Sequence, residues 1–364
     1  MTKRGAAAAE SRYKKLRVDV DRDLFNQGWI EIDVGDSPPV GTPIEYVDLF
    51  AGAGGICCGL RQAGFKKLLS NEIDKDASAT LRHNFPDSRH FEGSIEHLDL
   101  ASELPDIHHR PLPLVIGGPP CQGFSVAGFR RDDDPRNRMV DHFLRVVREL
   151  KPWFVVIENV PGILTLAGGK YRQAVIDTLG ELGYAASVRI LEAAEFGVPQ
   201  MRARAFFVAN RLGLPNPYPK PQLARERFVP IETAIADLAD LQADPSTNHE
   251  WTRHSAEMEL RISEVPPGGS LYSTFRDAWK RQHMGVPSMT IKENHGGTHI
   301  HPWKNRVLSA REMARLQSFP DDYFFRGTMK RAMWQIGNAV PPRLAQVLGL
   351  ALRPSILSAL ELGG

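Results

Sequence analysis

The chain has 364 residues, of which 42% are hydrophobic and 24% are charged, and its net charge at neutral pH is +2. This length exceeds what one hydrophobic core usually holds, so two domains are expected. The composition is that of an ordinary globular protein. No apolar run reaches the roughly 18 residues of a membrane span, and the basic start lacks the apolar core of a signal peptide. These features predict a cytoplasmic protein without a membrane partner.

The chain has three cysteines, Cys57, Cys58 and Cys121. An odd count with two adjacent members fits no disulfide framework. We therefore expect a reducing compartment, in which a single thiol can take part in chemistry. The nearly neutral charge does not by itself indicate a nucleic-acid partner, although it permits a local basic cleft.

In chain order, residues 1–43 resemble a charged tail that ends in a linker rich in Gly, Pro and Ser. Apolar runs and amphipathic segments then alternate. Strands are predicted at 44–50, 68–74, 113–118, 153–160, 186–196 and 202–210, and helices at 77–84, 139–150 and 171–183. This alternation predicts an α/β fold with a doubly wound, mostly parallel, Rossmann-like sheet that has helices on both faces. Ligands of such sheets lie at the carboxyl ends of the strands.

The periodicity breaks at about residue 211, where a Pro-rich stretch begins, and a regular helix returns at 309–317. We therefore expect four parts: a tail or linker at 1–43, a first domain at 44–210, a second, smaller domain at 211–325, and a segment at 326–364 that returns to the first domain. No internal repeat is visible.

The segment DLFAGAGG, residues 48–55, follows the first strong strand. Its glycines let the backbone approach a ligand closely, and the next helix offers unpaired N–H groups to an anion. Glu72 ends the following strand, in a position suited to ribose hydroxyls. Together they indicate a nucleoside cofactor, which could be NAD, FAD or S-adenosylmethionine. The alternative is a purely structural turn that binds no cofactor.

Cys121 follows a Pro-Pro pair at the end of a predicted strand, within GGPPCQGFSVAG. A single cysteine near a strand is commonly a small buried hydrophobe. Here the surrounding Gly/Pro/Ser loop and the charged stretch after it favour a nucleophile beside a mobile lid at 124–138. Glu158 ends the neighbouring strand and suits acid chemistry on a heterocycle, or a structural ion pair. Arg202 and Arg204 share one face of a strand.

Seven segments occur in the order typical of the bacterial-type DNA (cytosine-5)-methyltransferase family, which this chain resembles over about 44–210 and 290–350: DLFAGAGG, NEIDKDA, GGPPCQGFS, ENVPG, QMRAR, REMARLQSFP and QIGNAVPP. The resemblance implies that S-adenosyl-L-methionine methylates C5 of a cytosine flipped out of a specific duplex DNA sequence. It implies that Cys121 attacks C6, Glu158 contacts N3 and the exocyclic amine, Arg204 binds the O2 side, and Arg202 supports the same site or a phosphate. It also implies that 44–210 is the catalytic and cofactor-binding domain and that 211–325 is the target-recognition domain.

The resemblance also implies the cofactor site. Its residues are Phe50, Ala51, Gly52, Gly54, Gly55, Glu72, Ile73, Ser94, Ile95, Pro120, Asn338 and Val340. Within this set, Glu72 takes the ribose and Ile73 packs on adenine. The family usually has Asp where this chain has Ser94, which can still accept a hydrogen bond from the adenine amino group but carries no charge.

For double-stranded DNA, the implied partner, the expected contacts are Ser125, Arg130, Arg225, Arg227, Arg253 and Arg276, with Arg261, Lys280 and Arg281 as further candidates. The protein is expected to be a nucleoid-associated monomer, either a solitary methylase or one matched to a restriction endonuclease that acts on the same site without stable association. His295, His299 and His301 lack partners at metal-ligand spacing, so no metal is expected. The alternatives are a tRNA cytosine-5 methyltransferase and a catalytically inactive DNA-binding relative.

Overall fold

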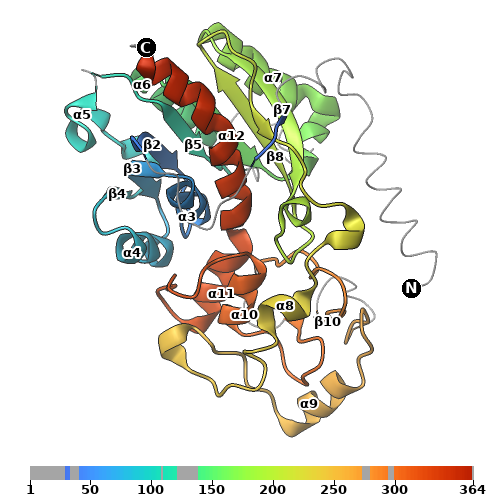
Figure 1. Ribbon diagram of the computed structural model, residues 1–364. Coiled ribbons are helices and arrows are strands. Elements are labelled where there is room, and N and C mark those ends of the chain that lie inside the picture. Colours follow the sequence, from blue (N-terminus) through green and yellow to red (C-terminus); the bar gives the residue numbers. More distant parts are fainter. Residues whose placement is uncertain are drawn as a thin grey trace.

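The computed structural model describes residues 29–32, 41–107, 110–120, 138–272, 279–293 and 299–362. Figure 1 shows an upper α/β part that holds the main sheet and a lower, more irregular part. The strands are β1 Trp29–Ile30, β2 Ile44–Leu49, β3 Phe65–Glu72, β4 Arg89–Glu92, β5 Leu114–Gly117, β6 Phe154–Asn159, β7 Ala185–Glu192, β8 Ala203–Asn210, β9 Tyr218–Pro219, β10 Lys280–Arg281 and β11 His299–Ile300. The helices are α3 Gly55–Gln62, α4 Lys75–Asn84, α5 Leu100–Glu103, α6 Arg138–Leu150, α7 Lys170–Glu181, α8 Ile231–Ile235, α9 Ala256–Ser263, α10 Ala310–Leu316, α11 Met329–Asn338 and α12 Pro342–Glu361.

The main sheet has seven strands in the order β4-β3-β2-β5-β6-β8-β7. The first five pair in parallel, and β8 runs antiparallel to both β6 and β7. The predicted doubly wound, mostly parallel sheet is therefore confirmed. The chain leaves β2 toward β3 on one side and later returns to pair β5 on the other side. This reversal opens a crevice between the carboxyl ends of β2 and β5, the usual ligand position in such folds.

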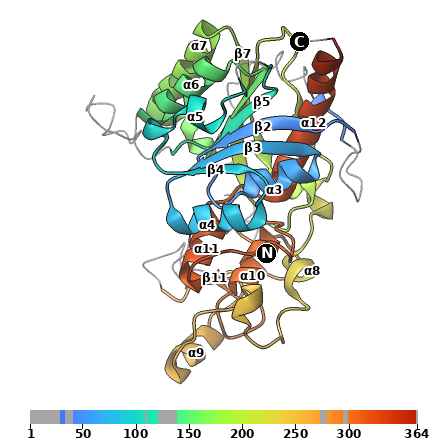
Figure 2. The same cartoon turned by 90° about the vertical axis from the view of Figure 1, so that its left-hand side faces the viewer.

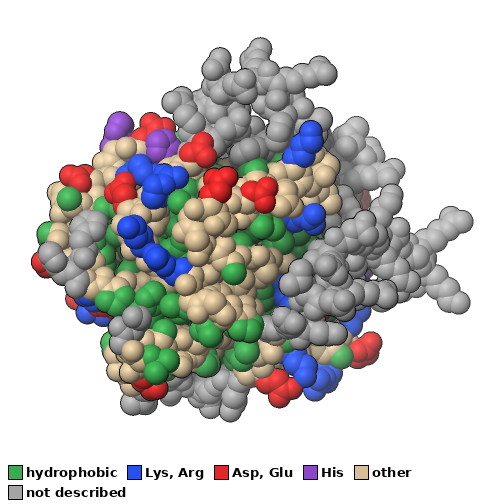
Figure 3. Space-filling view, turned by 90° about the horizontal axis from the view of Figure 1, so that it is seen from above, with side chains coloured by type: hydrophobic (Ala, Val, Ile, Leu, Met, Phe, Trp, Pro, Cys, Tyr) green, Lys and Arg blue, Asp and Glu red, His purple; other side chains and the backbone are tan. Residues whose placement is uncertain are grey.

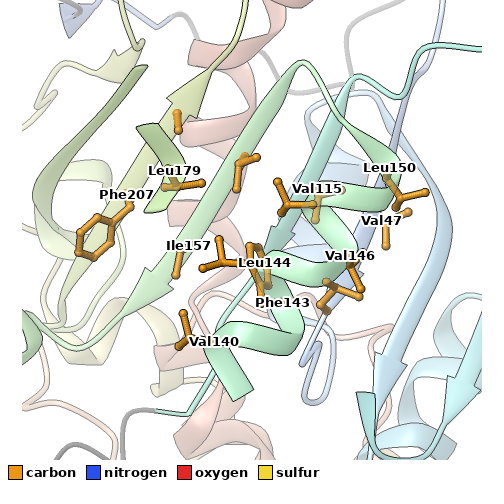
Figure 4. Close-up of a cluster of buried hydrophobic side chains, with 14 of the residues drawn as sticks. Val47, Val115, Val140, Phe143, Leu144, Val146, Leu150, Ile157, Leu179 and Phe207 are labelled. Carbon is orange, nitrogen blue, oxygen red and sulfur yellow. The ribbon is translucent and has the colours of Figure 1, made fainter. Parts of the chain in front are cut away.

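Helices cover both faces of the sheet, as Figure 2 shows, with α5, α6 and α7 on one face and α3 and α12 on the other. On the first face, apolar side chains along one side of α6 pack against the strands (Figure 4). Val140, Phe143, Leu144 and Val147 recur at the helical spacing of three and four residues, which places them on one side of the helix. Burial on both faces explains why the central strands are almost continuously apolar.

Helix α12 completes the second face, where it packs mainly against α3. Contrary to the expectation from the sequence, the stretch Met329–Glu361 is long and apolar enough to span a membrane by length and composition, and 56% of its most apolar window is buried within the fold. Packing against the sheet accounts for this apolar character. Helix α12, which lies in the segment 326–364, contacts α3 and β2.

The lower part of the molecule shares a hydrophobic cluster with the glycine turn. In this cluster α8, α10 and α11 pack against Ala53, Cys57 and Cys58. The Tyr323 hydroxyl donates to the Ala53 carbonyl over 2.6 Å, so the lower part directly buttresses the turn after β2. Ser309 caps α10 in a reciprocal pair with Glu312, which explains why the helix begins where the sequence predicts.

Two differences from the predicted elements have clear causes. The strand predicted at 186–196 ends at Glu192, because the following Ala193–Phe196 forms a 3-10 turn that closes on Gly197 with φ +84°. Within the predicted tail, Trp29–Ile30 adds a short parallel strand to β9, and the Arg189 guanidinium lies over the Trp29 ring. On the face seen from above in Figure 3, basic and acidic side chains are interspersed, as the small net charge suggests.

Candidate functional site

A cavity of about 480 Å³ lies at the crevice between the carboxyl ends of β2 and β5. Its walls come from the turns after β2, β3, β5 and β6, from the start of β8, and from the end of α11. Volumes of this size are typical of sites for small ligands and cofactors. The cavity thus brings together segments more than 250 residues apart in the sequence.

The turn after β2 forms one wall and depends on close backbone packing. Phe50 has a φ of +55° and Gly52 a φ of +54°, in the left-handed region, so the chain reverses sharply as it leaves the strand. At Gly55, which begins α3, a Cβ atom would lie 2.2 Å from the Val340 carbonyl oxygen. Only glycine permits this contact, which holds the turn against the segment that precedes α12.

Glu72 closes the cavity at the end of β3. Its carboxylate accepts hydrogen bonds from the backbone N–H groups of Gly52, Ile73 and Asp74, at 2.8, 2.9 and 2.8 Å. Burial raises the pKa of this carboxyl, and the three hydrogen bonds oppose the shift. A carboxylate offers about four acceptor positions. One position, on Oε2, therefore remains for a donor within the cavity.

Glu158 and Arg204 form an ion pair in the cavity wall, with 2.9 Å between Oε1 and Nε. Both side chains are mostly buried, at 12% and 13% exposed. Burial raises the pKa of Glu158, although Arg204 and Arg202 lower it. The net effect raises the pKa of Glu158, so this carboxyl holds a proton more readily than an exposed glutamate does.

Arg202 is almost completely buried and acts as a cross-link between segments. Its guanidinium donates to the carbonyls of Ile291, Gly337 and Ala339, at 2.7, 2.8 and 2.9 Å. Strand periodicity predicts the same environment for Arg202 and Arg204, and both do line the cavity. Their contacts differ: Arg202 binds backbone carbonyls and Arg204 binds a carboxylate.

The segments that carry Glu158 and Pro120 are tied together by Asn159. Its side-chain amide donates to the Pro119 carbonyl over 3.0 Å, and its oxygen accepts from the Val160 N–H over 2.9 Å. Gly118 also packs closely, because a Cβ atom there would lie 2.9 Å from Glu158 Oε2. The turn that leads to Cys121 is thereby held against the carboxyl group.

Most of the predicted site residues do meet in this one place. The predicted residues that line the cavity are Phe50, Ala51, Gly52, Gly55, Glu72, Ile73, Pro120, Glu158, Arg202, Arg204, Asn338 and Val340. Three others lie outside its wall. Gly54 packs under Tyr323, Ile95 is in the hydrophobic core, and the Ser94 hydroxyl caps a 3-10 turn by accepting from the Glu96 N–H over 3.3 Å. Cys121, Ser125, Arg130 and Arg276, with most of the predicted lid, lie outside the described residues.

Among the cavity residues that were not predicted, Trp334 and Glu293 have large or charged side chains. Trp334 lies four residues before the predicted Asn338 on α11, so the helical repeat could have placed it on the same face. Glu293 lies in an irregular segment, and its carboxylate accepts from the Asn338 side chain over 3.4 Å. No sequence periodicity indicates it.

Of the basic residues proposed to contact DNA, Arg225, Arg227 and Arg253 are exposed in the lower part. The expectation for Arg281 is wrong. This side chain is 5% exposed, and its guanidinium donates to four backbone carbonyls and the Asn305 side chain. A guanidinium committed to internal acceptors has no surface to offer to a nucleic acid.

His299 and His301 are also internal, whereas His295 lies outside the described residues. His299 is buried and lies 3.3 Å from the Gln282 side chain, while His301 Nδ1 accepts from the backbone N–H groups of Trp303 and Lys304. Among the described residues, no group of three or more His, Cys, Asp or Glu side chains is arranged to hold a metal ion.

The fold and site thus define an α/β protein with a cofactor-sized cavity at the switch point of its sheet and a buried carboxyl–arginine pair in the cavity wall. Comparison with known proteins is consistent with this class. The C-5 cytosine-specific DNA methylase family matches residues 44–353. The Type II methyltransferase M1.HphI of Haemophilus parahaemolyticus is 39% identical over 324 residues, which cover 85% of this chain and 86% of that protein. M.DdeI of Desulfomicrobium norvegicum is 33% identical, over 84% and 87% of the two chains.

Solved structures agree. A prophage-encoded DNA modification methyltransferase from E. coli superposes with a TM-score of 0.66 at 27% identity, covering 86% of this chain and 99% of that one. The Spodoptera frugiperda DNMT2 structure, at 18% identity and a TM-score of 0.63, shares the fold. The chain belongs to the C-5 cytosine-specific DNA methylase family, and the prediction of a DNA cytosine methyltransferase is confirmed.

Proposed function

We propose that the protein transfers a methyl group from S-adenosyl-L-methionine to C5 of a flipped cytosine within a specific duplex DNA sequence, with Cys121 as the nucleophile. The observation that carries this proposal is the position of Glu158. Its buried carboxyl borders the same cavity as Glu72 and Pro120, the residue immediately before Cys121. A base bound beside Glu158 would have this carboxyl on one side. On its other side it would face the part of the cavity lined by Glu72, where the cofactor is proposed to bind.

The described residues fit the proposed cofactor. The free acceptor position of Glu72 suits a ribose hydroxyl, and the open backbone at Gly52, where a Cβ atom would meet nothing within 4 Å, leaves room for the amino-acid part. Ile73 is 67% exposed, which leaves an apolar surface for a purine ring. When bound, S-adenosyl-L-methionine supplies an electrophilic methyl group. Phe50, Ala51, Gly54, Gly55, Ser94, Ile95, Asn338 and Val340 remain in the proposed cofactor set.

The chemistry proposed for the protein's own groups concerns activation of the base. Cytosine C5 is a poor nucleophile until C6 is saturated, so addition of the Cys121 thiolate to C6 divides one difficult step into easier ones. Negative charge then develops toward N3 and O2. The burial that raises the pKa of Glu158 favours a protonated carboxyl, which donates to N3. Arg204 fixes the orientation of this carboxyl and faces the O2 side. Once C5 has gained the methyl group, loss of the C5 proton and elimination of the thiolate restore the aromatic ring.

Recognition of DNA is proposed for the lower part of the molecule, the predicted target-recognition domain. A base inside a duplex is inaccessible, so it must be extruded at a cost of a few kcal/mol. Arg225, Arg227, Arg253 and Arg276 are proposed to contact phosphates or bases there, while Ser125 and Arg130 are proposed to contact the DNA backbone or to fill the gap that the extruded base leaves.

The biological setting of the enzyme follows from its relatives. Both M1.HphI and M.DdeI are named as Type II methyltransferases. We propose the same role in modification here, as a monomer that associates with the nucleoid in the cytoplasm. A restriction endonuclease that acts on the same site would be a functional partner without stable association.

Bisulfite sequencing of DNA from cells that express the chain tests the activity and reports the recognition sequence. Duplex DNA containing 5-fluorocytosine at that sequence should become covalently trapped in the presence of S-adenosyl-L-methionine. Cys121→Ser should abolish trapping, whereas Cys58→Ala, a change at a buried cysteine outside the cavity wall, should preserve it. Methylation of tRNA but not of DNA would contradict the proposed substrate, and an absence of trapping would contradict the nucleophile.

A further inference from the structure

Trp334 is an aromatic wall of the cavity that the proposed mechanism does not use. It lies on α11 one turn before Asn338, and it borders the cavity together with Ile73 and Ala77. The chain has six tryptophans at positions 29, 153, 251, 279, 303 and 334, all of them among the described residues. Of these, Trp334 alone lines the cavity.

The indole of Trp334 is held in place by Arg331. The Arg331 guanidinium lies over the ring at 4.5 Å from its centroid, a cation–π arrangement. The same guanidinium donates from Nε to Asp76 Oδ2 over 2.7 Å and from its terminal nitrogen to Asp74. Because two carboxylates fix the cation, the ring that it covers is also restricted.

These contacts join α11 to the end of β3, where Glu72 lies. Asp74 caps α4, and its backbone N–H donates to Glu72 Oε1 over 2.8 Å. Gln335, the next residue on α11, accepts from the Thr80 hydroxyl over 2.6 Å. Trp334 therefore borders the half of the cavity formed by Glu72 and Ile73, whereas Glu158 and Arg204 border the half beside Pro120.

The chemistry of this half suits a flat aromatic heterocycle. Ile73 presents an exposed apolar surface, and Trp334 adds a large aromatic surface that is oriented by the partly exposed ion pairs of Arg331 with Asp74 and Asp76. Aromatic side chains stack on nucleobases because every base has a π face. Pre-orientation reduces the entropy lost when such a contact forms.

We propose that Trp334 packs against the adenosine part of the methyl donor, with Arg331 as the residue that positions it. This inference rests on the proposed cofactor and adds a specificity-determining contact that neither the glycine turn nor Glu72 supplies. Its chemical consequence is that the protein recognises the donor through an aromatic surface contributed by α11. This helix is far from the glycine turn in the sequence, although both line the same cavity.

Binding of S-adenosylhomocysteine to the purified full chain, measured by calorimetry without DNA, tests this inference independently of catalysis. Trp334→Ala should raise Kd by about 5- to 100-fold, the range found when a base loses an aromatic partner. Trp334→Phe should have a smaller effect. Titration of S-adenosylhomocysteine should quench tryptophan emission in the wild type and leave the emission of Trp334→Phe nearly unchanged.

The matched control is Trp251→Phe. Trp251 also lies under an arginine, with the Arg306 guanidinium 4.2 Å from its ring centroid, but it does not line the cavity. This variant should bind S-adenosylhomocysteine like the wild type and should retain the quenching. Circular dichroism and melting temperature confirm that each variant is folded.

The positioning role of Arg331 is tested by a double-mutant cycle. Arg331→Lys keeps a charge but loses the planar, bidentate guanidinium. It should weaken binding several-fold in the wild-type background and have no further effect in Trp334→Ala. A loss that persists in Trp334→Ala would show that Arg331 acts through Asp74 and Glu72, and would overturn its role on the indole.

The outcomes separate this inference from the function on which it rests. If the wild type does not bind S-adenosylhomocysteine, the proposed cofactor is wrong. If the wild type binds but the folded Trp334→Ala variant binds equally well, the cofactor stands and the role of Trp334 is wrong.

Discussion

Replacement of Arg202 and of Arg204 by methionine should give opposite phenotypes, although the two arginines are separated by a single residue and line the same cavity. Methionine keeps an unbranched side chain of similar reach and removes the guanidinium. Arg202→Met should chiefly reduce stability, and Arg204→Met should chiefly reduce activity.

The expected loss of stability follows from the hydrogen-bond partners of each guanidinium. Arg202→Met leaves the carbonyls of Ile291, Gly337 and Ala339 without this donor. Each buried group that loses its partner costs roughly 1–3 kcal/mol. Removal of a buried charge offsets part of this sum, so a net loss of about 4 kcal/mol is expected. For a chain of 364 residues, the unfolding entropy is about 0.8 kcal/mol per kelvin, so the melting temperature should fall by about 5 °C.

Arg204→Met should cost less than about 2 kcal/mol, because Glu158 can take up a proton once its partner is gone. The same change removes the group that orients the Glu158 carboxyl. Loss of such a preorganised electrostatic contact lowers kcat by roughly 100-fold or more.

Differential scanning fluorimetry and a tritium-transfer assay on duplex DNA measure both quantities, with the temperature of the assay kept well below either melting point. A folded, fully stable Arg202→Met variant that is inactive would place Arg202 in the chemistry. Wild-type turnover by Arg204→Met would refute the role given to the ion pair.

Three further predictions concern buried groups near the cavity. Glu158→Gln should lower kcat/KM by roughly 100- to 10,000-fold, and in the wild type kcat/KM should fall as pH rises through the raised pKa of this carboxyl, a decline that the variant should lack in a pH–rate profile. Burial raises the pKa of Asp48 to about 7 although the Cys57 thiol donates to it over 2.9 Å. The folded state therefore retains a proton that the unfolded chain releases above about pH 4, and stability should fall by a few kcal/mol between about pH 4 and 7. Urea unfolding of Asp48→Asn should show a flatter dependence on pH, and an unchanged slope would argue against this assignment. Gly55→Ala places a methyl group against the Val340 carbonyl and should cost about 3 kcal/mol or prevent soluble expression, whereas Gly180→Ala, where a Cβ atom meets nothing within 4 Å, should be tolerated.

The arrangement of the sheet was accessible from local pattern, because strand and helix periodicity is written into consecutive residues. The apolar strands at 44–50 and 153–160 agree with β2 and β6 to within one residue at each end. The ligand-binding edge then followed from a general rule of parallel sheets. Motif order added the expectation that Glu72, Glu158 and Asn338 meet, and all three line one cavity.

The role of each side chain depended on distant partners. Arg281 belonged to a basic stretch in the sequence, yet the carbonyls of 262, 265, 301 and 304 surround it in the folded chain. Strand periodicity places Arg202 and Arg204 on the same face. Because α11 packs close to Arg202, this side chain donates to backbone carbonyls, whereas Arg204 pairs with Glu158.

The sequence by itself determined the class of fold, the family and half of the residues around the cavity, because these depend on local periodicity and on motifs of consecutive residues. Only the tertiary structure decided which charges are internal, which glycines support a close approach, and that Trp334 borders the cavity beneath the guanidinium of Arg331. Such contacts join residues that are hundreds of positions apart, and their geometry is set by the packing of whole elements and not by the residues next to them in the chain.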